Sequence, residues 1–222
     1  MGRRARWVLG VAGAAWAALA FGMAGEPEWR EGWLYFGMVT LGLTAVRLYA
    51  TRRNPELVAA RRWIGADTPT WDKLWVLVYW PLLLSVPVAA GRAHRAGADP
   101  LPGWVLAVGA LLAAGGFAIA AAAQAQNPFF EVTARLQTER AQRVVEAGPY
   151  RRVRHPGYLG LALWGTGAAL LLRSTVALAL SGVLAGWIVL RTALEDRMLR
   201  RSLAGYDAYA QRVRARLIPG LW

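Results

Sequence analysis

Six apolar segments constrain the fold of this 222-residue chain more than any other feature of its sequence. They lie at about 7–25, 32–50, 74–91, 101–123, 157–172 and 175–191. Each is close to the roughly 20 residues that an α-helix needs to cross the hydrocarbon core of a bilayer. Hydrophobic residues make up 56% of the chain, which is more than a soluble domain of this size normally carries. The sequence therefore predicts an all-α integral membrane protein with about six transmembrane helices.

The first and last segments carry additional signals. Arginines precede the first segment, which ends near Gly25, and a cleaved signal peptide would share this pattern. The length of the apolar run and the tryptophan that follows it, Trp29, favour a retained helix with an interfacial anchor. Only a short connection around Arg173 separates the last two segments, so we expect them to form a helical hairpin.

The placement of arginines predicts the orientation of the chain. If the N-terminus is cytoplasmic, the connections 25–31, 92–100 and 173–174 lie outside, and their basic and acidic residues balance. The formal net charge of +13 then lies on the cytoplasmic side, as the positive-inside rule predicts. We therefore expect both termini to be cytoplasmic. Because topology accounts for the charge, we expect no nucleic-acid partner.

Three larger connections lie on the cytoplasmic side in this orientation, at 51–73, 124–156 and 192–222. Because the outer connections are short, we expect the chemistry to take place in these inner ones. The predicted organisation is therefore a set of N-terminal transmembrane helices with a cytoplasmic amphipathic loop at 1–123, followed by a cofactor-binding region at 124–222. The two parts are expected to form one structural unit.

Local signals predict the secondary structure of the inner connections. Asn54 suits the N-cap and Pro55 the first position of a short amphipathic helix. The sequence around Gly148 predicts a tight turn or a small hairpin. The chain from 192 to about 214 predicts a cytoplasmic helix with a break near Gly205. The apolar residues expected on one side of the first of these helices are Leu57, Val58 and Trp63.

A first polar cluster stands at the start of the fifth apolar segment, in the sequence GPYRRVRHPGYLG from position 148. Pro156 suits the first helical turn, so His155 falls at or next to the N-cap. The positive end of the helix favours a neutral imidazole, which can both donate and accept hydrogen bonds. Tyr158 adds an aromatic face with a hydroxyl, and Gly160 keeps the next turn open. Together these residues predict a nest for a polar, partly anionic small molecule at the membrane surface.

A second polar cluster follows the sixth apolar segment. Glu195 and Asp196 stand within a basic tract, and an antiparallel hairpin brings Glu195 to the membrane depth of the first cluster. A carboxylate there suits the two hydroxyls of a ribose, and the alternative is a salt bridge with Arg191 on the same helical face. Tyr206 and Tyr209 share one face of the following helix, where they either cover a bound base or pack at the interface.

The combined motifs resemble those of the isoprenylcysteine carboxyl methyltransferase family and its relatives, the membrane phospholipid N-methyltransferases. The matching stretches are GPYxxVRHPxYLG, the acidic pair after the hairpin, and YxxYxxRVRxRLIP, while RNPEL with WDK at 53–73 resembles the bacterial branch. The resemblance implies an S-adenosylmethionine site in a bacterial inner (plasma) membrane protein. It maps cofactor binding onto Arg154, His155, Pro156, Tyr158, Gly160, Glu195, Asp196, Tyr206 and Tyr209. This chain has Glu195-Asp196 where many members carry Glu-Glu.

Methyl transfer is compatible with the residues present. Attack on a sulfonium methyl group depends on alignment and desolvation more than on an acid, a base or a metal. The chain has no cysteine, and we expect no metal site. We expect a lipophilic acceptor from the bilayer, with Arg154 or Arg191 as the candidate catalytic residue that orients an acceptor carboxylate.

Several acceptors and two other functions stay open at this stage. A prenylated cysteine, another lipid acid, a phospholipid amine and a small lipophilic thiol all fit a methyltransferase of this kind. The first alternative function is an NADPH-dependent membrane reductase of the sterol type. A basic site would accept the 2′-phosphate of NADPH. The second is a non-catalytic membrane protein with a vestigial pocket. The sequence predicts no particular oligomeric state.

Overall fold

A computed structural model describes residues 3–60, 65 and 67–222, and within these ranges the chain is helical without a strand. The predicted all-α fold is therefore confirmed for the described residues. The α-helices are α1 Arg3–Ala24, α2 Arg30–Arg53, α3 Pro55–Ala60, α4 Thr70–Arg95, α5 Val105–Gln126, α6 Pro156–Leu171, α7 Thr175–Ser202 and α8 Tyr206–Arg212. Two short 3-10 helices, η1 Thr138–Arg140 and η2 Gly148–Arg151, lie in the long connection between α5 and α6.

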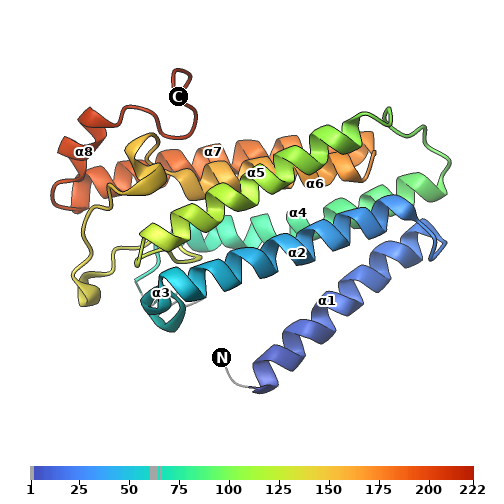
Figure 1. The fold of residues 1–222 in the computed structure, drawn as a ribbon, viewed down its shortest axis with the longest axis horizontal. Coiled ribbons are helices and arrows are strands. Elements are labelled where there is room, and N and C mark those ends of the chain that lie inside the picture. The colour runs from blue at the N-terminus through green and yellow to red at the C-terminus, as the bar shows by residue number, and fades with distance from the viewer. Residues whose placement is uncertain (1–2, 61–64, 66) are drawn as a thin grey trace.

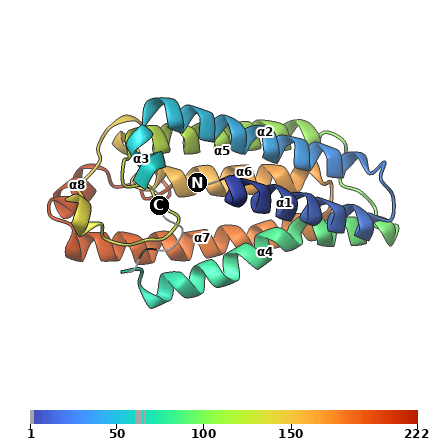
Figure 2. The same ribbon diagram turned by 90° about the horizontal axis from the view of Figure 1, so that it is seen from below.

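The long helices form an elongated antiparallel bundle (Figures 1 and 2). Helices α2, α4, α5, α6 and α7 run side by side, while α1 packs along α4 at one end and diverges from the bundle toward the N-terminus. The connections α1–α2, α4–α5 and α6–α7 lie at one end of the bundle. Helices α3 and α8 and the connection between α5 and α6 lie at the opposite end, which we call the α8 end. Both polar clusters of the sequence are therefore brought to the α8 end.

All six predicted apolar segments fall on helices. Among the described residues, four helices are long and apolar enough to cross a membrane, namely α2, α4, α5 and α7. Helix α6 has 16 residues, and α1 contributes a shorter apolar stretch at Val11–Ala24, so membrane crossing by these two helices stays a prediction. The predicted hairpin is formed by α6 and α7, because only the connection around Arg173 separates them. Helix α7 continues beyond the predicted apolar segment and carries the acidic pair on its last turns.

Backbone contact between small residues holds α5 against α6. A Cβ atom on Gly116 would lie 2.6 Å from the carbonyl oxygen of Gly160 and 2.3 Å from the amide nitrogen of Trp164. A Cβ atom on Gly160 would lie 2.7 Å from the carbonyl oxygen of Gly116. Small residues let two helices approach each other this closely. In a membrane such packing drives helix association, because lipid tails are as apolar as the side chains and give no hydrophobic driving force between helices. This contact fixes the start of α6, and therefore His155, relative to α5.

The short helix α3 begins as the sequence predicts. Asn54 precedes it, and its Oδ1 accepts a hydrogen bond from the amide of Leu57 at 3.2 Å. The side chain of Leu57 is buried, and Asn54 Nδ2 donates to the carbonyl of Gln124 at 2.8 Å, so α3 packs against the bundle. Trp63 and the side chain of Val58, which we expected to extend the apolar face, lie outside the described residues.

The sequence around Gly148 predicts a tight turn or a small hairpin, and the structure has the turn. Gly148, with a φ of 57°, is the first residue of η2, and no hairpin forms in the described chain. The predicted break near Gly205 is confirmed, because α7 ends at Ser202 and Gly205, with a φ of 80°, precedes α8.

The α5–α6 contact predicts that two adjacent glycines differ sharply. Gly116→Ala should lower the free energy of unfolding by about 1–3 kcal/mol, because the added methyl group meets the backbone of α6. Gly115→Ala is the matched control, since a Cβ atom at Gly115 meets nothing within 4 Å. Thermal unfolding in detergent measures the difference. Equal melting temperatures of the two variants would contradict direct backbone contact between α5 and α6.

Candidate functional site

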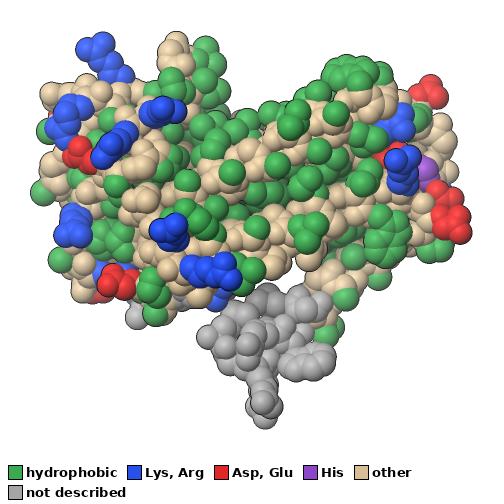
Figure 3. Space-filling model, viewed as in Figure 1, with side chains coloured by type: hydrophobic (Ala, Val, Ile, Leu, Met, Phe, Trp, Pro, Cys, Tyr) green, Lys and Arg blue, Asp and Glu red, His purple; other side chains and the backbone are tan. Residues whose placement is uncertain are grey.

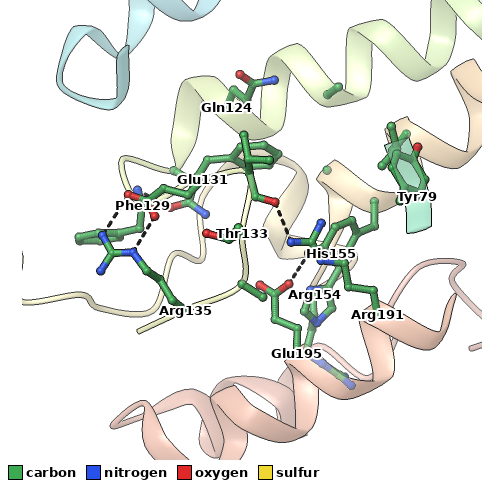
Figure 4. A pocket seen from close by; sticks show the side chains of 18 of the residues that line it. Tyr79, Gln124, Phe129, Glu131, Thr133, Arg135, Arg154, His155, Arg191 and Glu195 are labelled. Atoms are coloured by element: carbon green, nitrogen blue, oxygen red, sulfur yellow. Dashed lines mark hydrogen bonds and ion pairs between the residues drawn. The ribbon is translucent and has the colours of Figure 1, made fainter. Parts of the chain in front are cut away.

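A single cavity of about 370 Å³ links the interior of the bundle to the α8 end. This volume is within the range of small-molecule sites, roughly 300–1,000 Å³. Its inner part is lined by apolar and aromatic side chains that include Trp16, Tyr35, Val39, Leu83, Phe117, Leu161 and Trp164. Its outer part is lined by polar and charged side chains that include Gln124, Glu131, Thr133, Arg135, Arg154, His155, Arg191 and Glu195 (Figure 4). We call these two parts the apolar and the polar compartment.

Asp196 on α7 lies at the centre of a buried ion-pair network behind the polar compartment. Its side chain is 1% exposed and accepts two hydrogen bonds from Arg154, from Nε at 2.7 Å and from Nη2 at 3.1 Å. The Nε atoms of Arg200 and Arg216 lie 3.3 Å and 3.1 Å from Asp196 Oδ2. Burying a carboxylate is expensive unless several donors replace water, and these three arginines supply them. We call Asp196 with Arg154, His155, Arg200, Tyr206 and Arg216 the Asp196 cluster.

Arg154 joins this cluster to the C-terminal tail. Its Nη1 donates to the carbonyl oxygens of Val213 and Arg214, both at 2.7 Å. Burial alone would lower the pKa of Arg154, but its hydrogen bonds and ion pair with Asp196 raise it above the usual value, so the guanidinium stays charged. The backbone amides of Arg154 and His155 donate to the tail carbonyls of Ala215 and Arg216, each at 3.0 Å. The tail is therefore fixed beside the first turn of α6.

His155 occupies the N-cap position of α6, as the sequence predicts. Its Nε2 lies 3.3 Å from Asp196 Oδ1 and 3.2 Å from the hydroxyl of Tyr206. The Tyr206 hydroxyl in turn donates to Asp196 Oδ1 at 3.0 Å. The imidazole stacks on the ring of Tyr158, with centroids 5.8 Å apart. His155 is therefore held by side chains from α6, α7 and α8 at the wall of the cavity.

Tyr158 and Glu195 meet in the polar compartment. The Tyr158 hydroxyl donates a short hydrogen bond to Glu195 Oε2. Glu195 is half-buried, lines the cavity and forms no ion pair within the described chain. The salt bridge between Glu195 and Arg191 that their spacing allowed is not formed, because Arg191 instead pairs with Asp72 of α4 at 2.8 Å. Glu195 thus presents a negative charge to the cavity.

The structure separates the predicted residues into two groups. Those that line the cavity are Arg154, His155, Tyr158, Arg191, Glu195, Tyr206 and Tyr209. Pro156, Gly160 and Asp196 are not among its lining residues. Gly160 faces α5, Pro156 is buried in the first turn of α6, and Asp196 lies behind His155 within its cluster. We therefore assign these three to the support of the site.

The cavity also includes polar residues that the sequence reasoning did not select. Glu131 and Arg135 form a buried ion pair, with Arg135 Nε 2.8 Å from Glu131 Oε2. Their spacing of four residues was a usable signal, although it usually marks an exposed helical pair. Asp72 does not line the cavity, but it pairs with Arg191, which does. The sequence reasoning did not select Asp72, because a carboxylate at the edge of an apolar segment normally faces water. Its side chain is instead fully buried.

The described residues define a bundle of apolar, membrane-length helices with a cavity that joins an apolar compartment to a polar one. Residues 107–201 match the family model of isoprenylcysteine carboxyl methyltransferase (ICMT). The match extends from α5 through most of α7, so it contains His155, Tyr158, Arg191 and Glu195. It confirms the resemblance found in the sequence and supports membership of the chain in this family. A search of curated proteins finds no match to the chain.

The Asp196 cluster predicts a large stability difference between two aspartates at the α8 end. Asp196→Asn should lower the free energy of unfolding by about 3–5 kcal/mol, because it leaves buried Arg154 without its counterion. Asp207→Asn removes an exposed partner of Arg200 and should cost about 0–1 kcal/mol. Denaturation monitored by circular dichroism in detergent compares them. A mild effect of Asp196→Asn, equal to that of Asp207→Asn, would disprove the structural importance of the cluster.

Proposed function

We propose that this protein transfers a methyl group from S-adenosylmethionine to a lipophilic acceptor at the cytoplasmic surface of a bacterial inner membrane. The observation that carries the proposal is the continuous cavity, which joins an apolar compartment inside the bundle to a polar compartment at the α8 end. A cavity of this kind would bring the methyl group of a water-soluble donor next to the polar group of a lipid acceptor. The match of residues 107–201 to the ICMT family model supports methyl transfer as the reaction.

The polar compartment has a donor and acceptor set that fits S-adenosylmethionine. When bound, this cofactor supplies a methyl group on a positively charged sulfur. Arg154 and Arg191 pair with Asp196 and Asp72, whereas the half-buried Glu195 lines the cavity without an ion pair in the described chain, so its carboxylate is suited to a cation. The residues that would hold the cofactor are His155, Tyr158, Glu195, Tyr206 and Tyr209, with Arg154, Pro156, Gly160 and Asp196 supporting them.

Two features of these residues match parts of the cofactor. The carboxylate of Glu195 is suited to accept hydrogen bonds from the hydroxyls of a ribose. Aromatic faces such as that of Tyr158, which lines the cavity, attract cations. We therefore assign ribose binding to Glu195 and attraction of the sulfonium to Tyr158.

The apolar compartment suits the hydrocarbon part of an acceptor. Its aromatic lining is contributed by α1, α2, α4, α5 and α6, within the part of the bundle where lipid chains would surround the protein. Arg191 lies between this lining and Glu195, whereas the donors of Arg154 are directed to Asp196 and the tail. We therefore assign orientation of the acceptor's polar group to Arg191. The chain then contributes alignment and exclusion of water to the reaction.

Surface charge supports the proposed orientation. Hydrophobic side chains cover the middle of the face in Figure 3, and most of its Lys and Arg side chains gather at the α8 end. The exposed arginines of this end include Arg151, Arg152, Arg197, Arg201 and Arg214. Positive charge of this kind favours the cytoplasmic side of a membrane. We infer that the α8 end, with the cavity's polar compartment, faces the cytoplasm.

Calorimetry with two competing cofactors tests the proposal. The purified protein in detergent should bind S-adenosylhomocysteine and should not bind NADPH, because the carboxylate of Glu195 in the cavity would repel a phosphate group. Absence of NADPH binding in the same titration would exclude the reductase alternative. Preferential binding of NADPH would contradict methyl transfer, and binding of neither ligand would favour a non-catalytic protein.

The assignment of Glu195 predicts a selective loss of cofactor affinity. Glu195→Gln should weaken S-adenosylhomocysteine binding about tenfold or more, because it removes a charged hydrogen-bond acceptor from the cavity. Its melting temperature should change little. Glu146→Gln is the control, since Glu146 is exposed and pairs with Arg212. Wild-type affinity in Glu195→Gln would refute the ribose assignment.

A further inference from the structure

Asp72 is a buried carboxylate in the first turn of α4. It belongs to the WDK motif of the sequence, but that motif assigned no role to it. Its side chain is 0% exposed. Oδ1 lies 2.8 Å from Arg191 Nε, and Oδ2 accepts a hydrogen bond from Arg191 Nη2 at 3.1 Å. Oδ2 also accepts from the backbone amide of Ala134 at 2.6 Å. One carboxylate therefore joins α4 both to α7 and to the connection between α5 and α6.

Arg191 is held on several sides. Its guanidinium carbon lies 4.2 Å from the centre of the Trp75 ring and 5.3 Å from the centre of the Tyr158 ring. Nη2 donates to the carbonyl oxygen of Val132 at 2.7 Å. Within the described chain, Nη1 forms no hydrogen bond, and Arg191 lines the cavity. Figure 4 shows Arg191 and Glu195 extending from α7 toward the cavity wall that carries Thr133.

These contacts give Asp72 two effects on the cavity. Its negative charge compensates Arg191, so a cation is kept in a buried place that would otherwise disfavour it. Its hydrogen bond to Ala134 fixes the backbone next to Val132 and Thr133, which also line the cavity. Both effects act on the boundary between the two compartments, where the polar group of a lipophilic acceptor would lie.

We propose that Asp72 is a positioning residue for acceptor binding, which acts by fixing the Arg191 guanidinium with Nη1 available to the acceptor's polar group. The inference rests on the proposed methyl transfer and extends it to the acceptor side of the site. It differs from a purely structural role in one respect. A positioning residue on the acceptor side affects acceptor affinity more than cofactor affinity, whereas a general loss of packing affects both.

The test measures two affinities in four proteins. The probes are N-acetyl-S-farnesylcysteine, which carries a carboxylate on a lipophilic chain, and S-adenosylhomocysteine. The proteins are wild type, Asp72→Asn, Arg191→Gln and the double variant. Asp67→Asn is the matched control for Asp72→Asn, because Asp67 is exposed, and Arg197→Gln is the control for Arg191→Gln, because Arg197 is an exposed arginine of the same helix.

Asp72→Asn should weaken binding of the farnesylcysteine probe about tenfold, while its affinity for S-adenosylhomocysteine stays within about twofold of wild type. The double variant should bind the farnesylcysteine probe no more weakly than Arg191→Gln alone, because Asp72 acts through Arg191. Both control variants should bind the two probes as wild type does.

Three results would overturn the positioning role. They are unchanged affinity of Asp72→Asn for the farnesylcysteine probe, an equal loss of affinity for both probes, and additive losses in the double variant. A different result would contradict the proposed function itself. If the wild-type protein does not bind S-adenosylhomocysteine, the methyl-transfer proposal fails, and the role of Asp72 that rests on it fails as well.

Discussion

The arrangement of the site depends on one buried carboxylate. Asp196 forms ion pairs with Arg154, which precedes α6, with Arg200 of its own helix and with Arg216 of the tail. Its carboxylate also contacts the side chains of His155 and Tyr206. A carboxylate removed from water is stable only when such donors surround it. Burial of Asp196 therefore depends on α6, α7, α8 and the tail packing together. The Asp196 cluster thereby sets the position of α8 and the tail against the hairpin of α6 and α7.

A second buried ion pair complements the first. Asp72 and Arg191 join α4 to α7 at the other side of Tyr158, and Trp75 stacks on the guanidinium. Each pair gives its arginine a carboxylate partner, whereas Glu195 lines the cavity without an ion pair in the described chain. The two adjacent acidic residues of α7 therefore differ in their contacts. Asp196 holds the structure together, and Glu195 is available to a ligand.

Local features of the chain could be predicted from the sequence, because their causes are local. The apolar segments, the cap at Asn54, the break at Gly205 and the N-cap position of His155 each depend on a few neighbouring residues. The role of Gly160 could not be predicted, since its close neighbour Gly116 lies on another helix. Asp72 was missed for the same reason, because its partner Arg191 is 119 positions further along the chain. The sequence left a tight turn or a small hairpin open around Gly148, and the structure has the turn. The hydrogen bonds from the amides of Arg154 and His155 to the tail could not be predicted, because the tail lies far along the chain.

If the methyl donor and the acceptor occupy adjoining compartments of one cavity, as we propose, both must bind at the same time. The most direct measurement is a calorimetric titration of S-adenosylhomocysteine into protein that has been saturated with N-acetyl-S-farnesylcysteine. We predict that the cofactor product binds with an affinity close to that measured without the lipid, because the polar compartment remains accessible. Mutually exclusive binding of the two ligands would contradict the division of the cavity into two compartments.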